Sequence, residues 1–196
     1  MARKGTVYVS FDIETGREYC GILQLSAEMV RVELRPVETK KGSSATMDYA
    51  SLVSREALTF NQFVKPGEGA IWNDNVTSIH GLHQNHLSII GADDMDTVWE
   101  QFVRWYDENM RSGEVAILVA YNGETCDLKW LWMLTQAPRS PYDLPETMIY
   151  FMDPLKVIKQ YVGCKLNPKH SKLDSLELGV VWKHINSGAN LNGAHD

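Results

Sequence analysis

The most constraining feature of this 196-residue chain is a continuous apolar run at residues 114–121, EVAILVAY. The run has the length of a strand and shows no alternation between apolar and polar positions. Such runs are typical of a strand that is buried on both faces, as in sheets covered by helices. Helical patterns precede and follow it, so the segment predicts the centre of a layered α/β domain.

Further strand patterns occur on either side of this run. We expect three successive strands at residues 7–13, 22–34 and 59–64, forming an antiparallel meander, and a fifth strand at residues 148–152. Helices are expected from Asp93 or Asp94 to about Met110 and at residues 127–135, 154–161 and 173–185. This order predicts a ribonuclease-H-like α/β fold, a mixed five-stranded sheet flanked by helices on both faces. We expect one domain over residues 1–196, with a polar loop insertion at about 35–58.

Charge and cysteine content limit the classes of function. The chain has 19 Lys and Arg against 25 Asp and Glu, a net charge of −6, which argues against coating of nucleic acid by a basic surface. An enzyme that holds a nucleic-acid end through metal ions remains compatible with this charge. Cys20, Cys126 and Cys164 show no CxxC spacing, so disulfides and zinc are not expected. We expect an intracellular protein, cytoplasmic or nuclear, with no membrane partner; the oligomeric state is left open.

Three carboxylates are candidates for a common site. Asp12 and Glu14 are two residues apart at the end of the first expected strand, so their side chains should point to the same face. Asp127 falls in the first turn of the helix that follows the central run. Each also has a plain structural explanation, a solvated strand face for the pair and a favourable helix dipole for Asp127. If the two strands are neighbours, the three carboxylates form a site for a hard cation such as Mg²⁺ or Mn²⁺.

Histidine and tryptophan residues are weaker candidates. His195 lies near the last residue of the chain and could be simply solvated. His80 could approach a substrate end or cap the end of a helix. The four tryptophans at helical spacings are expected in the core rather than on a base-stacking surface; they are Trp99, Trp105, Trp130 and Trp132.

Taken together, these segments resemble the DEDDh family of 3′–5′ exonucleases. Residues 9–16, VSFDIETG, resemble its first motif, and residues 118–127, with Asn122 five positions before Asp127, resemble the second. Residues 63–66 and 77–82, FVKP and TSIHGL, resemble the segment that leads to the terminal nucleotide. Residues 172–176 and 193–196, KLDSL and GAHD, resemble the approach to the third motif. That motif ends with an Asp five residues after its His, a position beyond Asp196, so a truncated or degenerate domain is expected.

The resemblance implies a metal-dependent 3′–5′ exonuclease that releases nucleoside 5′-monophosphates from single-stranded DNA or RNA by two-metal-ion hydrolysis. Asp12, Glu14 and Asp127 would hold Mg²⁺ or Mn²⁺, and His195 would be the general base, with Glu14 also contacting the terminal 3′ hydroxyl. The substrate-binding residues implied are Thr15, Gly16, His80, Leu82 and Asn122. Activity of the chain as it stands is expected to be weak or absent. The alternative is a catalytically silent exonuclease-like module that binds RNA or a protein partner.

Overall fold

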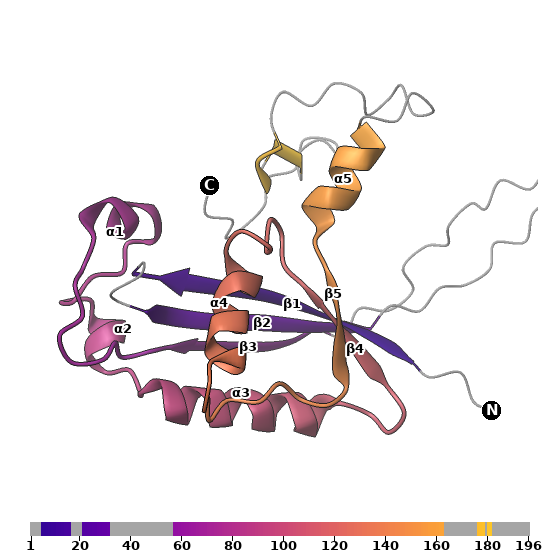
Figure 1. Ribbon diagram of the computed structural model, residues 1–196, viewed down its shortest axis with the longest axis horizontal. Coiled ribbons are helices and arrows are strands. Elements are labelled where there is room, and N and C mark those ends of the chain that lie inside the picture. Colours follow the sequence, from indigo (N-terminus) through magenta and orange to yellow (C-terminus); the bar gives the residue numbers. More distant parts are fainter. Residues whose placement is uncertain (1–4, 17–20, 32–56, 163–175, 179, 182–196) are drawn as a thin grey trace, which may run out of the picture.

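The computed structural model describes residues 5–16, 21–31, 57–162, 176–178 and 180–181 (Figure 1). Its centre is a five-stranded sheet in the order β3-β2-β1-β4-β5. The strands are β1 (Thr6–Thr15), β2 (Ile22–Arg31), β3 (Ala57–Phe63), β4 (Val115–Val119) and β5 (Met148–Met152). β1, β2 and β3 pair antiparallel as a meander, whereas β4 pairs parallel with both β1 and β5. The predicted mixed five-stranded sheet is therefore confirmed.

The helices that connect and cover the strands are α1 (Asp74–His80), α2 (Leu87–Ile90), α3 (Met95–Asn109), α4 (Asp127–Gln136) and α5 (Pro154–Val162). The longest, α3, begins where the Asp94 carboxylate accepts the Thr97 N–H at 2.9 Å, as its N-cap position predicts. The short helices α1 and α2 are not predicted by the sequence pattern. α1 is fixed locally, by the Asn73 side chain at its start and by Gly81 at its end, which has a φ of 75°.

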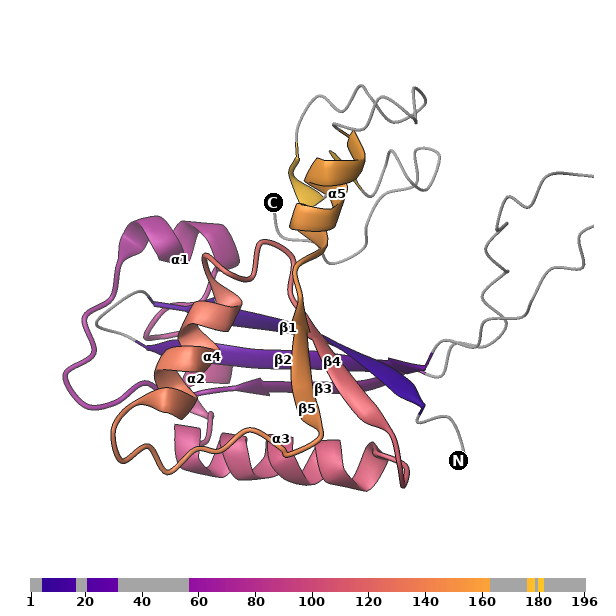
Figure 2. The same cartoon turned by 45° about the vertical axis from the view of Figure 1, so that its right-hand side comes forward.

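The core lies between one face of the sheet and helices α3 and α4. Alternate residues of β1, among them Val9 and Phe11, are buried together with Leu131 of α4. The Phe102 ring of α3 lies 6.0 Å from the Phe11 ring and 5.5 Å from the Phe60 ring, in edge-to-face contacts. Both helices therefore cover the same face, and α4 crosses in front of the strands in Figure 2.

Some sequence predictions fall partly outside the described residues. Most of the expected insertion at 35–58 is undescribed, but Ala57 and Leu58 belong to β3. Of the expected helix at 173–185, residues 178, 180 and 181 are described as helical. The core prediction is wrong for Trp132, whose side chain is 62% exposed, although Trp99 is buried. Helical spacing alone did not show that Trp132 lies on the outer side of α4.

The parallel strands decide where a site can form. β1, β4 and β5 run in the same direction, so their carboxyl ends meet at one edge of the sheet (Figure 1). α4 follows β4 and α5 follows β5, so the helix N-termini lie at this edge. Ligand sites in α/β sheets typically form there. None of the helices in the described ranges has the length and the apolar composition needed to cross a membrane.

Candidate carboxylate site

Asp12 and Glu14 stand near the carboxyl end of β1 and share a face of the sheet. Their neighbours on that strand, Phe11 and Ile13, are buried under the helices, so the two carboxylates point to the other face. Asp12 is exposed and Glu14 is half-buried. The register shifts between Glu14 and Thr15, and this bulge marks the end of regular pairing with β2. The predicted common face of the pair therefore agrees with the strand geometry.

Asp127 is brought to the same strand by the turn between β4 and α4. It is the first residue of α4 and is 6% exposed. Its Oδ1 accepts the backbone N–H of Ile13 at 2.9 Å, and Ile13 lies between Asp12 and Glu14. Asp127 is therefore adjacent in the fold to Asp12 and Glu14, which lie more than one hundred residues earlier in the sequence.

The turn before Asp127 is tightly packed. A Cβ on Gly123 would lie 2.5 Å from the Ala120 Cβ and 3.0 Å from the Ala120 carbonyl oxygen, so only glycine fits. The Gly123 carbonyl accepts the N–H groups of Cys126 and Leu128 at 3.2 and 2.8 Å, which leads the chain into α4. The glycine thus lets the turn approach β4 closely enough to place Asp127 beside Ile13.

The electrostatics of the site reflect this crowding. Burial, and then the charges of Asp12 and Asp127, raise the pKa of Glu14 from 4.5 to about 7. Burial is also the largest cause that raises the pKa of Asp127 to about 6, with further contributions from Asp12 and Asp153, while the Ile13 N–H acts in the opposite direction. Burial and the same carboxylates raise the pKa of the Cys126 thiol to about 11. Glu14 and Asp127 therefore both bind protons more tightly than free carboxyl groups do, and a bound cation would relieve the repulsion among the carboxylates.

Asp153 is a member of the site that the sequence did not reveal. It follows β5 directly, and its Oδ1 accepts the N–H groups of Asn122 and Leu155, each at 2.9 Å. The signal that could have found it is its position between a predicted strand and the Pro154 that opens the next helix, where an N-capping aspartate is favoured.

The expected substrate-binding residues occupy the same edge of the sheet. The His80 ring bridges two segments, with Nε2 3.1 Å from the Thr15 carbonyl oxygen and Nδ1 accepting the Leu82 N–H at 3.0 Å. The contact with Thr15 holds the end of α1 against the end of β1. The contact with the Leu82 N–H is the helix-capping role, one of the two expectations for His80. Gly16 and Leu82 are buried, and Asn122 is exposed. His195, the expected general base, lies outside the described residues.

The carboxylates are suitable ligands for a hard divalent cation, but in the described structure they are not close enough together to bind one. Asp12, Glu14 and Asp127 offer carboxylate oxygens, the ligands that Mg²⁺ and Mn²⁺ prefer. Across the described ranges, no three His, Cys, Asp or Glu side chains are placed so that they could hold a metal ion. The residues thus fit the chemistry of a metal site, and the metal remains a proposal.

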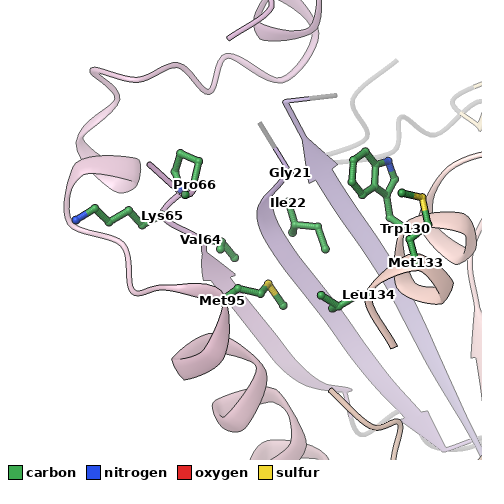
Figure 3. Close-up of a pocket in the computed structure, with 10 residues that line it drawn as sticks. Gly21, Ile22, Val64, Lys65, Pro66, Met95, Trp130, Met133 and Leu134 are labelled. Atoms are coloured by element: carbon green, nitrogen blue, oxygen red, sulfur yellow. The ribbon is translucent and has the colours of Figure 1, made fainter. Parts of the chain in front are cut away.

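A pocket of about 320 Å³ lies farther along α4 (Figure 3). Trp130, Met133 and Leu134 line it from α4, and Ile22 and Met95 line it from β2 and α3. Its lining is mainly apolar, and the Lys65 ammonium points away from it (Figure 3). Ile22 pairs with Thr15, the residue after Glu14, so the pocket reaches the end of β1 on the face that α3 and α4 cover.

No family model matches the sequence, and no curated protein is significantly similar to it in sequence. Solved structures are similar. The crystal structure of cell-death related nuclease 4 (CRN-4) has a TM-score of 0.63 at 16% identity, over 98% of this chain and 59% of that one. The nuclease domain of 3′hExo, a DEDDh family member bound to rAMP, has a TM-score of 0.59 at 14% identity, over 99% of this chain and 84% of that domain.

A third similar structure is a 3′-exonuclease that recognises the 3′ end of a histone mRNA stem-loop. Its TM-score is 0.56 at 14% identity, over 93% of this chain and 71% of that one. The fold of this chain is therefore similar to that of these solved nuclease structures. At these identities the likeness concerns the fold, and the chain spans less than two thirds of CRN-4. Within this fold, Asp12, Glu14 and Asp127 lie at the edge of the sheet described above.

Proposed function

We propose that this protein is a metal-dependent 3′–5′ exonuclease that hydrolyses single-stranded nucleic acid and releases nucleoside 5′-monophosphates. One hydrogen bond carries the proposal. The Ile13 N–H donates to Asp127 Oδ1 at 2.9 Å, and Ile13 lies between Asp12 and Glu14 on β1. This bond holds Asp127 beside Asp12 and Glu14 at the carboxyl edge of a DEDDh-type fold.

In this proposal Asp12, Glu14 and Asp127 hold Mg²⁺ or Mn²⁺. Such ions, when bound, activate water and stabilise the leaving oxygen of a phosphodiester. Glu14, whose pKa is raised to about 7, also contacts the terminal 3′ hydroxyl, which sets the direction of cleavage. His195 takes the proton from the attacking water as general base, a role worth about 10²–10⁴-fold in rate.

The neighbouring pocket is proposed to accept a nucleobase. Met133 lies six residues beyond Asp127 on α4, about 9 Å along the helix axis, within one or two nucleotides of the carboxylates. Mainly apolar pockets of about 300–1,000 Å³ commonly bind small molecules. Met133→Glu should raise KM with little change in kcat, because a charge in the pocket weakens binding only. Trp132→Glu, at the neighbouring position of α4 but outside the pocket lining, is the matched control.

RNA is the substrate favoured by the comparisons. One similar structure holds rAMP and another recognises a histone mRNA stem-loop. We propose the same substrate class here, and matched RNA and DNA single strands will separate the two. The contacts that distinguish them are made to the 2′ hydroxyl.

A catalytically silent, nucleic-acid-binding module is the second candidate. The observation in its favour is that no metal-holding group of three side chains is found in the described part of the chain. The burial of Asp127 counts against this candidate. A carboxylate that is 6% exposed lowers the stability of the fold, and a silent module would have no catalytic use for it.

The test is degradation of a 5′-labelled RNA single strand by the full chain in Mn²⁺ and in EDTA. We expect stepwise shortening from the 3′ end in Mn²⁺, and a block by a 3′-phosphate. Asp127→Asn should abolish shortening, whereas Glu28→Gln, on the neighbouring strand, should not. Cleavage of a circular single strand would contradict the exonuclease, and strand binding without any shortening would favour the silent module.

A further inference from the structure

We infer that Asp153 is a positioning residue, which fixes the turn at residues 121–126 and through it the Asp127 carboxylate of the proposed site. One carboxylate oxygen holds two segments together. Asp153 Oδ1 accepts the Asn122 N–H from the turn and the Leu155 N–H from the first turn of α5, both at 2.9 Å. The inference rests on the proposed function only in its effect on catalysis.

The sheet brings Asp153 to this turn. Val119 pairs with Met152, and the Ala120 N–H donates to the Met152 carbonyl at 3.2 Å, so β4 and β5 stay paired to their last residues. Asp153 and Tyr121 are the next residues on the two strands. The carboxylate is therefore delivered to the turn by strand pairing, where the two chains diverge.

The turn needs such an anchor for two reasons. Asn122 has a φ of 55°, a left-handed conformation that is uncommon for a residue other than glycine. Cys126 stands at the N-cap of α4, and its side chain makes no capping hydrogen bond in the described structure. The start of α4 is thus held by backbone contacts within the turn, and the Asp153 carboxylate supplies an external one.

Capping of α5 does not account for both contacts. An N-cap aspartate needs only the N–H of its own helix, here that of Leu155. The hydrogen bond to Asn122 crosses to another segment, 31 residues away in sequence. A second link between α5 and the turn, the exposed ion pair of Lys156 with Glu124, joins the same segments without contacting Asn122. The two links can therefore be removed separately.

The variants follow from these contacts. Asp153→Ala removes the Oδ1 acceptor, whereas Asp153→Asn retains an oxygen acceptor at the Oδ1 position. Lys156→Ala removes only the exposed ion pair. Asp94→Ala removes the N-cap of another helix, α3, with a similar expected loss of stability of the whole fold.

The first readout is amide hydrogen exchange of Ile13, whose N–H donates to Asp127 Oδ1. In Asp153→Ala this amide should exchange about ten-fold faster relative to buried amides of β1, because Asp127 is no longer held in place. Asp153→Asn, Lys156→Ala and Asp94→Ala should keep the parent ratio. An unchanged ratio in Asp153→Ala overturns the inference, whether or not the protein degrades RNA.

The second readout is the rate of Mn²⁺-dependent shortening of RNA. Asp153→Ala should lower kcat by about 10²-fold with KM nearly unchanged, since a carboxylate displaced by about 1 Å has this effect. Asp153→Asn should restore most of the rate. A parent without activity contradicts the proposed function alone, whereas equal rates in an active parent and Asp153→Ala overturn the positioning role.

Discussion

Glu14→Gln should make the stability of the metal-free protein less dependent on pH between 4.5 and about 7. Partial burial, and then the charges of Asp12 and Asp127, raise the pKa of Glu14 from 4.5 to about 7. The folded protein therefore binds this proton more tightly than the unfolded chain. The resulting stability is fully present below pH 4.5 and is lost as the pH rises to about 7.

The magnitude follows from that interval. For a fully buried group, a rise in pKa from 4.5 to about 7 would change the free energy of unfolding by about 3 kcal/mol. Glu14 is only half-buried, so solvent screening reduces the expected contribution to about 1–2 kcal/mol. Between pH 4 and pH 8, the free energy of unfolding of Glu14→Gln should rise by this amount relative to that of the parent.

Urea unfolding in EDTA at a series of pH values measures the difference. Glu28→Gln is the control. Glu28 lies on β2 and is also half-buried on the same sheet face, but it pairs with Ser10 of β1 and not with a carboxylate. Millimolar Mn²⁺ should stabilise the parent more than Glu14→Gln. A difference between Glu14→Gln and the parent that is constant from pH 4 to pH 8 would refute the electrostatic reasoning.

Two further substitutions test the packing of the fold by urea unfolding, Arg31→Met at the end of β2, opposite the start of β1, and Gly123→Ala beside the site. Arg31→Met should cost about 3 kcal/mol, because it leaves the carboxylate of Glu114 nearly buried without its partner at 2.8 Å; Arg104→Ala, which breaks an exposed pair, should cost less than about 0.5 kcal/mol. Gly123→Ala should destabilise the fold by about 1–3 kcal/mol, since its Cβ would lie 2.5 Å from that of Ala120. A neutral result for either Arg31→Met or Gly123→Ala would contradict the packing described.

The sheet could be predicted from the sequence because its signals are local. β5 matches the predicted bounds, Met148–Met152, and α4 begins at the predicted Asp127. Both segments have turn-forming residues at their ends and an apolar pattern of the right length between them. Asp12 and Glu14 follow from the same alternation along β1, which requires only that one face be buried.

The features that could not be predicted depend on contacts distant in sequence. α1 is short, and its last residue, His80, is fixed by the Thr15 carbonyl, 65 residues earlier. Trp132 and Trp130 have the same helical environment in sequence, yet only Trp130 lies over the core. Asp153 needs the pairing of β4 with β5 before its contact with Asn122 exists. Local propensity carries no information on such contacts.

The bond between Ile13 and Asp127 links the site to the core in a particular way. The Ile13 side chain is 3% exposed within the core, while its backbone N–H holds the Asp127 carboxylate. No side-chain substitution at Ile13 removes that N–H, except proline. The arrangement of the carboxylates therefore tolerates exchange of apolar residues under β1, and depends instead on the turn that delivers Asp127. Apart from the carboxylates themselves, Gly123 and Asp153 are thus the positions on which we expect this arrangement to depend most.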